Sequence, residues 1–276
     1  MLGGTAAPTE GDPVTYRPQL MPTQVPDGQG PGLWYRIEGE LVPVLHLALD
    51  GQMPVFFEHH VILWKQAQVQ VGMHKLKGAF KRLIGGMPIF MTEAQGAGEI
   101  AFSRDSVGHV FPLHLSHGQS LVVREHQFLA ATGNLEYTFE RVRGFGSMLF
   151  GQQGFFVDRF DANQGDAVLW LHAHGNAFEV NLGPGEVIDI EPGGWVYRDP
   201  SVQYQQTVYG LKTGLLGGGG NIVWNRFTGP GRVCLQSGYY TGEAVAVAGG
   251  TISGGAKAGL GGAAIGGLLG GILGGD

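Results

Sequence analysis

A segment of this chain occurs three times in succession, and this repetition restricts the fold more than any other feature of the sequence. The copies are marked by glycines spaced 67 residues apart, and a fourth glycine opens a shorter echo: Gly51, Gly118, Gly185 and Gly242. The chain contains 50 glycines, so the spacing alone carries little weight. The runs that follow also correspond, because residues 51–63 match residues 118–129, and residues 185–192 keep the same order of residue types. We therefore predict an internal triplication.

Apolar and polar residues alternate just before each marker glycine. The three triplets are Leu45-His46-Leu47, Leu113-His114-Leu115 and Val180-Asn181-Leu182. Successive side chains of a strand point to opposite faces, so the alternation predicts half-buried strands whose central polar residue lies on the face opposite its neighbours. The predicted fold class is all-β, built from three tandem repeats of antiparallel strands in a pseudo-threefold arrangement.

A glycine-bounded stretch that carries at least one cation precedes a strand-like run in each copy. These stretches are residues 76–86, 142–151 and 211–218, and the strand-like runs are residues 89–92, 155–160 and 222–227. Apolar residues bounded by glycines in this way are typical of short amphipathic helices or loops. We therefore expect short connecting helices, each followed by a β-meander.

Composition divides the chain into three regions. Residues 1–32 contain six prolines at near-regular intervals, which deny the segment both helix and sheet hydrogen bonding and predict a flexible leader. Residues 33–248 are the predicted triplicated β-repeat domain, and residues 249–276 are an apolar, glycine-rich tail. Only 14% of the residues are charged, against about a quarter in soluble proteins, which suggests surface buried in an oligomer or against a membrane.

One cysteine and the opening residues bear on the compartment. Cys234 stands alone, so no intramolecular disulfide can form, and a reducing compartment is expected. Residues 1–8 lack the basic and apolar regions of a secretory signal. The location that we expect is cytoplasmic, with peripheral attachment to the inner face of a membrane as the alternative.

The third copy holds a Gly-Glu…Glu-Pro-Gly…Tyr element at residues 185–197, and aromatic-rich runs ending in Arg-Phe occur at residues 155–160 and 222–227. This ordered combination resembles the altered-inheritance-of-mitochondria (AIM, mitochondrial biogenesis) family of unknown function, over residues 34–247. That family is grouped by fold with the tryptophan RNA-binding attenuation protein (TRAP). The resemblance implies a TRAP-like or double-stranded β-helix-like body that self-associates, and its mitochondrial relatives are tied to inner-membrane organisation. It supplies no accepted catalytic residues, so none is assigned.

A second interpretation rests on His172, His174 and Glu179. They follow Gly165 at spacings close to those of the cupin metal motif, in which two histidines and a glutamate are three ligands of a facial metal site. The second half of that motif requires a further histidine, but its place falls near Tyr197, and no histidine follows His174. The alternative function is therefore a cupin-like metal-dependent enzyme, whereas the favoured prediction has no metal, no cofactor and no catalytic residue.

Cations gather in one stretch of the first copy. Lys75, Lys77, Lys81 and Arg82 are candidates for contact with the phosphates of RNA or of anionic lipid. The chain carries a net charge of −6, and binding of single-stranded RNA usually combines a positive groove with exposed aromatic residues. We therefore favour a solvated helix face, place lipid contact second and RNA last, and expect no DNA binding.

Small residues recur every four positions in the tail. They include Gly262, Gly266, Gly270 and Gly274, and this spacing lines one helix face so that a second backbone can approach closely. The 18 residues 258–275 are uncharged, which reaches the lower limit for crossing a bilayer. Glycine costs about 1 kcal/mol per helical position in water, however. A disordered tether, a membrane or self-association element, and packing against the body all stay open.

The sequence repeats its structural features and does not concentrate its ionisable residues in one place. We therefore predict a non-enzymatic β-repeat scaffold or assembly protein. We expect it to form a homo-oligomer and to reach a membrane surface through its tail.

Overall fold

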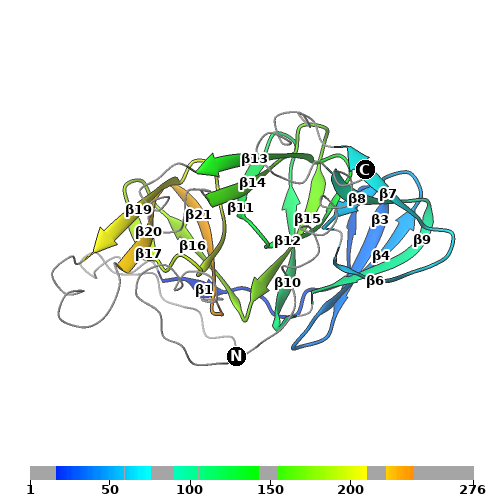
Figure 1. Ribbon diagram of the computed structural model, residues 1–276, viewed down its shortest axis with the longest axis horizontal. Helices are drawn as coiled ribbons and strands as arrows, with labels where there is room; N and C mark the ends of the chain where they lie inside the picture. The colour runs from blue at the N-terminus through cyan, green and yellow to red at the C-terminus, as the bar shows by residue number, and fades with distance from the viewer. Residues whose placement is uncertain are drawn as a thin grey trace, which may run out of the picture. The chain divides into compact units, whose positions relative to one another are not determined.

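The part of the chain that the structure describes is built from β-strands. The computed structural model describes residues 17–58, 60–75, 90–104, 106–142, 155–209 and 222–238, all within the first of two units, Met1–Val245 (Figure 1). These residues contain strands and no helix, and every sheet is antiparallel, so the all-β prediction is confirmed for them. The expected connecting helices at 76–86, 142–151 and 211–218 lie outside the described residues, apart from Val142 at the end of a strand.

Three strands precede three successive sets of six in the described residues. The first three are β1 (Gln19–Leu20), β2 (Gly28–Gly30) and β3 (Leu33–Glu38). Set one comprises β4 (Val44–Asp50), β5 (Val55–Phe57), β6 (Ile62–Lys65), β7 (Gln70–Lys75), β8 (Phe90–Gln95) and β9 (Ala97–Ser103). Set two comprises β10 (Gly108–Leu115), β11 (Ser120–Arg124), β12 (Phe128–Thr132), β13 (Glu136–Val142), β14 (Phe155–Asp161) and β15 (Ala167–His174). Set three comprises β16 (Ala177–Leu182), β17 (Val187–Ile190), β18 (Trp195–Arg198), β19 (Gln203–Tyr209), β20 (Ile222–Thr228) and β21 (Gly231–Gln236).

The same four antiparallel pairings occur within each set. The first strand pairs with the sixth, in β4·β9, β10·β15 and β16·β21, and the third also pairs with the sixth, in β6·β9, β12·β15 and β18·β21. The fifth strand lies between the second and the fourth in each set. Even the irregularity in the third strand recurs, with register shifts at 62/64, 128/130 and 195/197. A threefold axis relating the sets stays a prediction.

Pairing between sets joins the strands into larger sheets. β5 pairs with β12, and β11 pairs with β18, so the second strand of one set meets the third strand of the next. The resulting sheets have the orders β10-β15-β12-β5-β8-β7 and β1-β16-β21-β18-β11-β14-β13. The remaining described strands form β2-β3-β4-β9-β6 and β17-β20-β19.

The marker glycines lie in turns just before the second strand of each set. Gly51, Gly118 and Gly185 have φ angles of 87°, 85° and 78°. These values lie in the left-handed region, which an L side chain enters at a cost and glycine enters freely. The recurrence of glycine thus has a conformational cause at each turn. Gly242 lies outside the described residues.

The core follows the predicted alternation. Leu45 and Leu47 are fully buried around the less buried His46, and the triplets at 113–115 and 180–182 show the same order. Three clusters of buried apolar side chains make up the core, one around Phe57, Phe102 and Trp170, one around Phe111, Phe128 and Phe160, and one around Trp195 and Phe227. Each cluster joins strands of more than one sheet, and aromatic pairs such as Phe57–Phe102, with centroids 4.8 Å apart, lie within it.

Residues 17–32, the described part of the segment expected as a leader, contact the body. β1 pairs with β16, and β2 pairs with β3. The Met21 backbone N–H donates to the Ala177 carbonyl at 2.9 Å, and the Pro22 carbonyl lies 2.9 Å from Nε2 of His109. Prolines therefore leave enough free N–H groups in this stretch for two short pairings, which the proline spacing did not predict.

Candidate functional site

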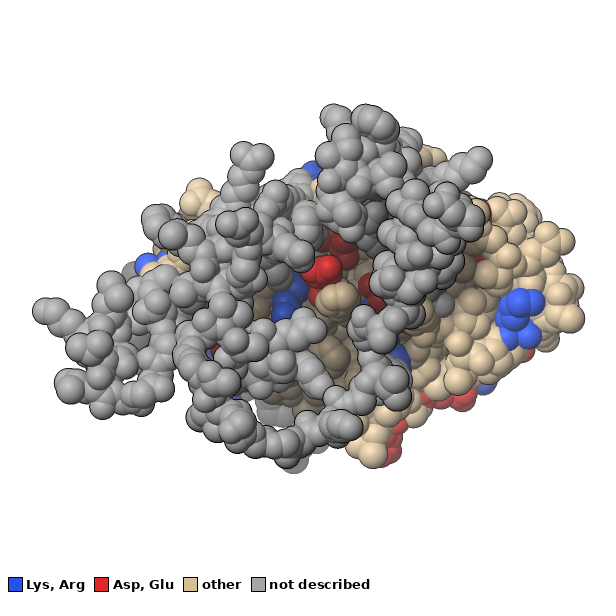
Figure 2. Space-filling model, viewed as in Figure 1, with Lys and Arg blue, Asp and Glu red and all other residues tan. Residues whose placement is uncertain are grey.

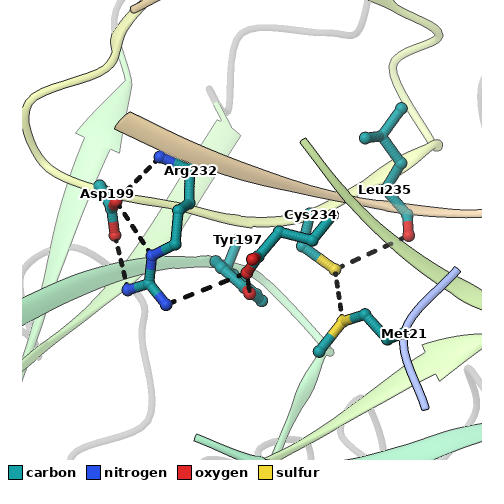
Figure 3. A network of polar contacts seen from close by, with 7 residues as sticks. Met21, Tyr197, Asp199, Arg232, Cys234 and Leu235 are labelled. Atoms are coloured by element: carbon teal, nitrogen blue, oxygen red, sulfur yellow. Dashed lines mark hydrogen bonds and ion pairs between the residues drawn. The ribbon is translucent and has the colours of Figure 1, made fainter. Parts of the chain in front are cut away.

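A polar network crosses the three neighbouring strands β16, β21 and β18 (Figure 3). The Tyr197 hydroxyl donates a hydrogen bond to Glu179 Oε2, and the Arg232 guanidinium lies 3.9 Å from the same oxygen. Arg232 also donates two hydrogen bonds to Asp199, from Nη2 to Oδ1 at 2.9 Å and from Nε to Oδ2 at 3.2 Å. Two carboxylates, one phenol and one guanidinium are thus held together across three strands.

Burial sets the protonation states in this network. Tyr197 is fully buried, and burial, followed by the charges of Cys234 and Glu179, raises the pKa of its phenol far above the ordinary value. Burial and Glu179 also raise the pKa of the Cys234 thiol. A thiol held protonated is a poor nucleophile, so Cys234 behaves as a small buried side chain, in contact with Met21 at 3.8 Å between the sulfurs (Figure 3).

Two histidines on β15 make a second polar group. His172 is only 1% exposed, and its ring centroid lies 5.2 Å from that of His174 in an edge-on arrangement. Burial, followed by the charges of Arg104 and His174, lowers the pKa of His172 to about 4, and the nearby backbone of Ser106 opposes this shift. The ring nitrogens of His172 find no hydrogen-bond partner of good geometry among the described residues. His172 is therefore neutral at neutral pH.

The structure does not bring the cupin-like residues together. His172 and His174 lie on β15 in one sheet, whereas Glu179 lies on β16 in another. There the Glu179 carboxylate accepts a hydrogen bond from Tyr197 and forms an ion pair with Arg232. Among the described residues, no three His, Cys, Asp or Glu side chains converge to hold a metal ion. The sequence places four residues between His174 and Glu179, but the chain changes sheets within that interval, so the alternative of a metal enzyme is not favoured.

A family model described as mitochondrial biogenesis AIM24 matches residues 35–238. The chain belongs to the AIM24 family. The crystal structure of protein SPYM3_0169 from Streptococcus pyogenes superposes with a TM-score of 0.59 at 22% identity, over 75% of this chain and 94% of that one. This likeness concerns the fold alone. No curated protein matches the chain.

The other predicted sites of this AIM24 family member lie outside the described residues. They are Lys77, Lys81 and Arg82 of the basic stretch and Gly262, Gly266, Gly270 and Gly274 of the tail. The backbone of Lys75 ends β7. No helix long and apolar enough to cross a membrane occurs in the part of the AIM24 chain that the structure describes.

Exposed apolar side chains at sheet edges were missed by the sequence reasoning. Leu63 and Trp64 on β6 are 57% and 39% exposed, and Met73 on β7 is 70% exposed. β6 and β7 are terminal strands of their sheets in the described residues. The residues that correspond to Leu63 and Trp64 in the other two sets are fully buried, so the difference depends on which third strands have a neighbour and does not follow from the sequence pattern.

Proposed function

We propose that this AIM24 family member is a non-enzymatic β-sheet scaffold that self-associates and works beside a membrane surface. The observation that carries the proposal is the exposure of large apolar side chains on terminal strands, above all Leu63, Trp64 and Met73. A sheet edge offers backbone donors and acceptors for another strand, and apolar side chains along it make such pairing favourable.

The polar network supports a structural role for the ionisable residues. Glu179, Tyr197, Arg232 and Asp199 each contact a residue of another strand or turn, so they fasten β16, β18 and β21 to one another. The high pKa of Tyr197 and of Cys234 leaves both groups protonated at neutral pH. This suits a structural contact between strands and does not suit acid, base or nucleophilic chemistry.

The surface composition also fits an assembly protein. Where described residues are visible in Figure 2, Lys, Arg, Asp and Glu occur in small groups separated by uncharged surface. The pairing of the fourth strand with the fifth recurs in all three sets, which we propose to reflect a triplicated and pseudo-threefold body, and it leaves the fourth strand at a sheet edge each time among the described residues. Repeating units that present equivalent edges favour association with further units.

The membrane part of the proposal rests on the tail. Its 18 uncharged residues and its glycine period supply an apolar helix face that lipid would stabilise, since a bilayer makes internal hydrogen bonding obligatory. The description of the AIM24 family by mitochondrial biogenesis is consistent with work at a membrane.

Sedimentation velocity of the full chain over a wide concentration range tests self-association. We expect an apparent mass above that of the monomer, and this mass should fall on dilution. A monomer at every concentration would overturn the scaffold proposal.

Flotation with vesicles of phosphatidylcholine and phosphatidylserine tests the membrane part. Removal of residues 249–276 should reduce flotation, and equal flotation of both chains would make the tail a tether only. The triple substitution Gly262→Leu, Gly266→Leu and Gly270→Leu should preserve flotation but weaken association through the tail.

A further inference from the structure

A series of strand pairings in the fold stops at two sheet edges. The second strand of set one pairs with the third strand of set two, and the second strand of set two pairs with the third strand of set three. The next step in this series would join β17, the second strand of set three, to β6, the third strand of set one. Within the described residues β17 pairs with β20 and β6 with β9, and the two strands belong to different sheets.

The two pairings that are present share one register. In the first, Ala131 lies opposite Phe56 and Ala130 opposite Phe57. In the second, Arg198 lies opposite Val122 and Tyr197 opposite Val123. Ala131 and Arg198 occupy the same position in their third strands, because each lies three residues after the last residue that pairs before the register shift. Phe56 and Val122 also correspond, because each pairs with the residue at the same position of its own fifth strand.

The same register can be written for β6 and β17. Lys65 is the counterpart of Ala131 and Arg198, and Asp189 is the counterpart of Phe56 and Val122. Continuing the series therefore places Lys65 opposite Asp189 and Trp64 opposite Ile190. Opposite charges and apolar pairs that face each other across strands stabilise a sheet. The edges match in charge and in apolarity, and a slip by one residue would oppose Lys65 to an isoleucine.

Two side chains of β6 are more exposed than their counterparts in the other sets, as expected for a strand that lacks a neighbour on one side. Leu63 and Trp64 are 57% and 39% exposed, whereas their counterparts in the other sets are all fully buried. Those counterparts are Leu129, Ala130, Val196 and Tyr197. The third strand of a set is thus buried where a strand of the preceding set pairs with it, and β6 is exposed because no described strand pairs with that edge.

We propose that β6 of one copy pairs with β17 of another copy in this register, which joins the chains head to tail. The proposal rests on the self-association proposed above and names its interface. A second copy fits the edge because it repeats the pairing that already joins set one to set two and set two to set three. Such an interface uses two different surfaces, so it closes into a ring or continues as a filament according to the rotation between copies.

The partners that Lys65 and Asp189 already have are compatible with this pairing. The Arg226 guanidinium donates to both carboxylate oxygens of Asp189 at 2.7 Å, and the Lys65 ammonium donates to the Val69 carbonyl at 2.9 Å. A carboxylate accepts about four hydrogen bonds and an ammonium donates three. The Lys65 ammonium also lies 3.5 Å from the Gln66 carbonyl. Asp189 can therefore accept from Lys65 of another copy while its contact with Arg226 and the contact of Lys65 with Val69 are kept.

Disulfide trapping between separately prepared variants tests the pairing in the full chain. Lys65→Cys and Asp189→Cys are mixed with oxidised glutathione, because directly opposed residues of an antiparallel pair lie about 4.5–5.5 Å apart, within disulfide range. Trp64→Cys mixed with Ile190→Cys is an independent second pair. The native Cys234 is buried and stays in place. The matched control is Lys65→Cys with Gln205→Cys, since Gln205 lies level with Asp189 on the opposite edge of the same three-stranded sheet.

We expect a crosslinked dimer of the two variants in both mixtures, formed at least about tenfold faster than in the control. A crosslink that forms only inside a chain carrying both cysteines would overturn the proposal in favour of closure within one chain. No crosslink in either mixture, from chains that stay folded by circular dichroism, would overturn it as well. Sedimentation of the unsubstituted chain distinguishes failure of this interface from failure of self-association. If the chain is an oligomer but the 65–189 crosslink does not form, self-association stands and only this interface is rejected.

Discussion

Tyr197 and Glu179 are joined by a hydrogen bond that passes over the strand between them. Both residues pair with Cys234, from β18 on one side of β21 and from β16 on the other, so their side chains share a face and meet above the thiol. Arg232 on β21 continues the contact to Asp199. Burial is the main reason that the phenol and the thiol stay protonated, and the charge of Glu179 raises the pKa of both groups further.

Replacing Tyr197 by phenylalanine should destabilise the fold without changing its assembly. The change leaves a carboxylate without its buried donor, which costs about 1–3 kcal/mol for a hydrogen bond to a charged group. The measurement is urea unfolding followed by tryptophan fluorescence. The matched control is Tyr204→Phe, because Tyr204 donates a neutral hydrogen bond to Asn225 at 2.9 Å and should cost about 1 kcal/mol. Equal losses in both variants would contradict a special role for the Glu179 contact.

Stability should fall as pH falls from about 6.5 to about 4, through His172. Its folded pKa is lowered to about 4, mainly by burial, while the unfolded histidine titrates near its ordinary value of 6.5. The unfolded state therefore binds more protons in this window, so the contribution is complete above pH 6.5 and about 3 kcal/mol of it is lost at pH 4. Unfolding measured at several pH values should show a shallower dependence in His172→Leu than in His117→Leu, which alters an exposed histidine. Parallel pH profiles for the two variants would rule this out.

Alanine at Gly118 should cost stability through backbone strain alone. The φ of Gly118 is 85°, and a Cβ there would meet no atom within 4 Å, so the left-handed conformation is the single penalty, about 1–2 kcal/mol. Gly72 on β7 offers the control, because its surroundings are equally open but its φ is ordinary. Gly72→Ala should leave stability unchanged or raise it by about 0.5 kcal/mol, measured by the same unfolding assay. A loss at Gly72 as large as that at Gly118 would contradict the conformational explanation.

Lysine at Trp64 should weaken self-association more than lysine at Trp34. Both tryptophans are exposed, at 39% and 61%, but only Trp64 lies on the proposed β6 edge, where it would face Ile190 of the next copy. We expect the dissociation constant from sedimentation to rise at least about tenfold for Trp64→Lys, which corresponds to about 1.4 kcal/mol, and to change little for Trp34→Lys. Equal effects would show that surface hydrophobicity in general, and not the β6 edge, drives association.

Much of the fold could be predicted because its signals are local. Alternation around His46, His114 and Asn181 indicates half-buried strands directly, and glycine at 51, 118 and 185 reports a backbone conformation at each position. The site was less predictable. His172 and Glu179 lie close in sequence but on different sheets, and Tyr197, Arg232 and Cys234 are brought to Glu179 only by the pairing of β16 and β18 with β21.

The sequence by itself therefore determined the fold class, the family resemblance and the positions of the strands and turns, because periodicity and backbone conformation depend on neighbours along the chain. Tertiary structure alone decided which strands are adjacent and which stand at an edge. Leu63 and Leu129 occupy the same position in their sets and are similar in the sequence, yet one is exposed and the other fully buried. Burial depends on a strand from another set, and no pattern within a single set records whether that strand is there.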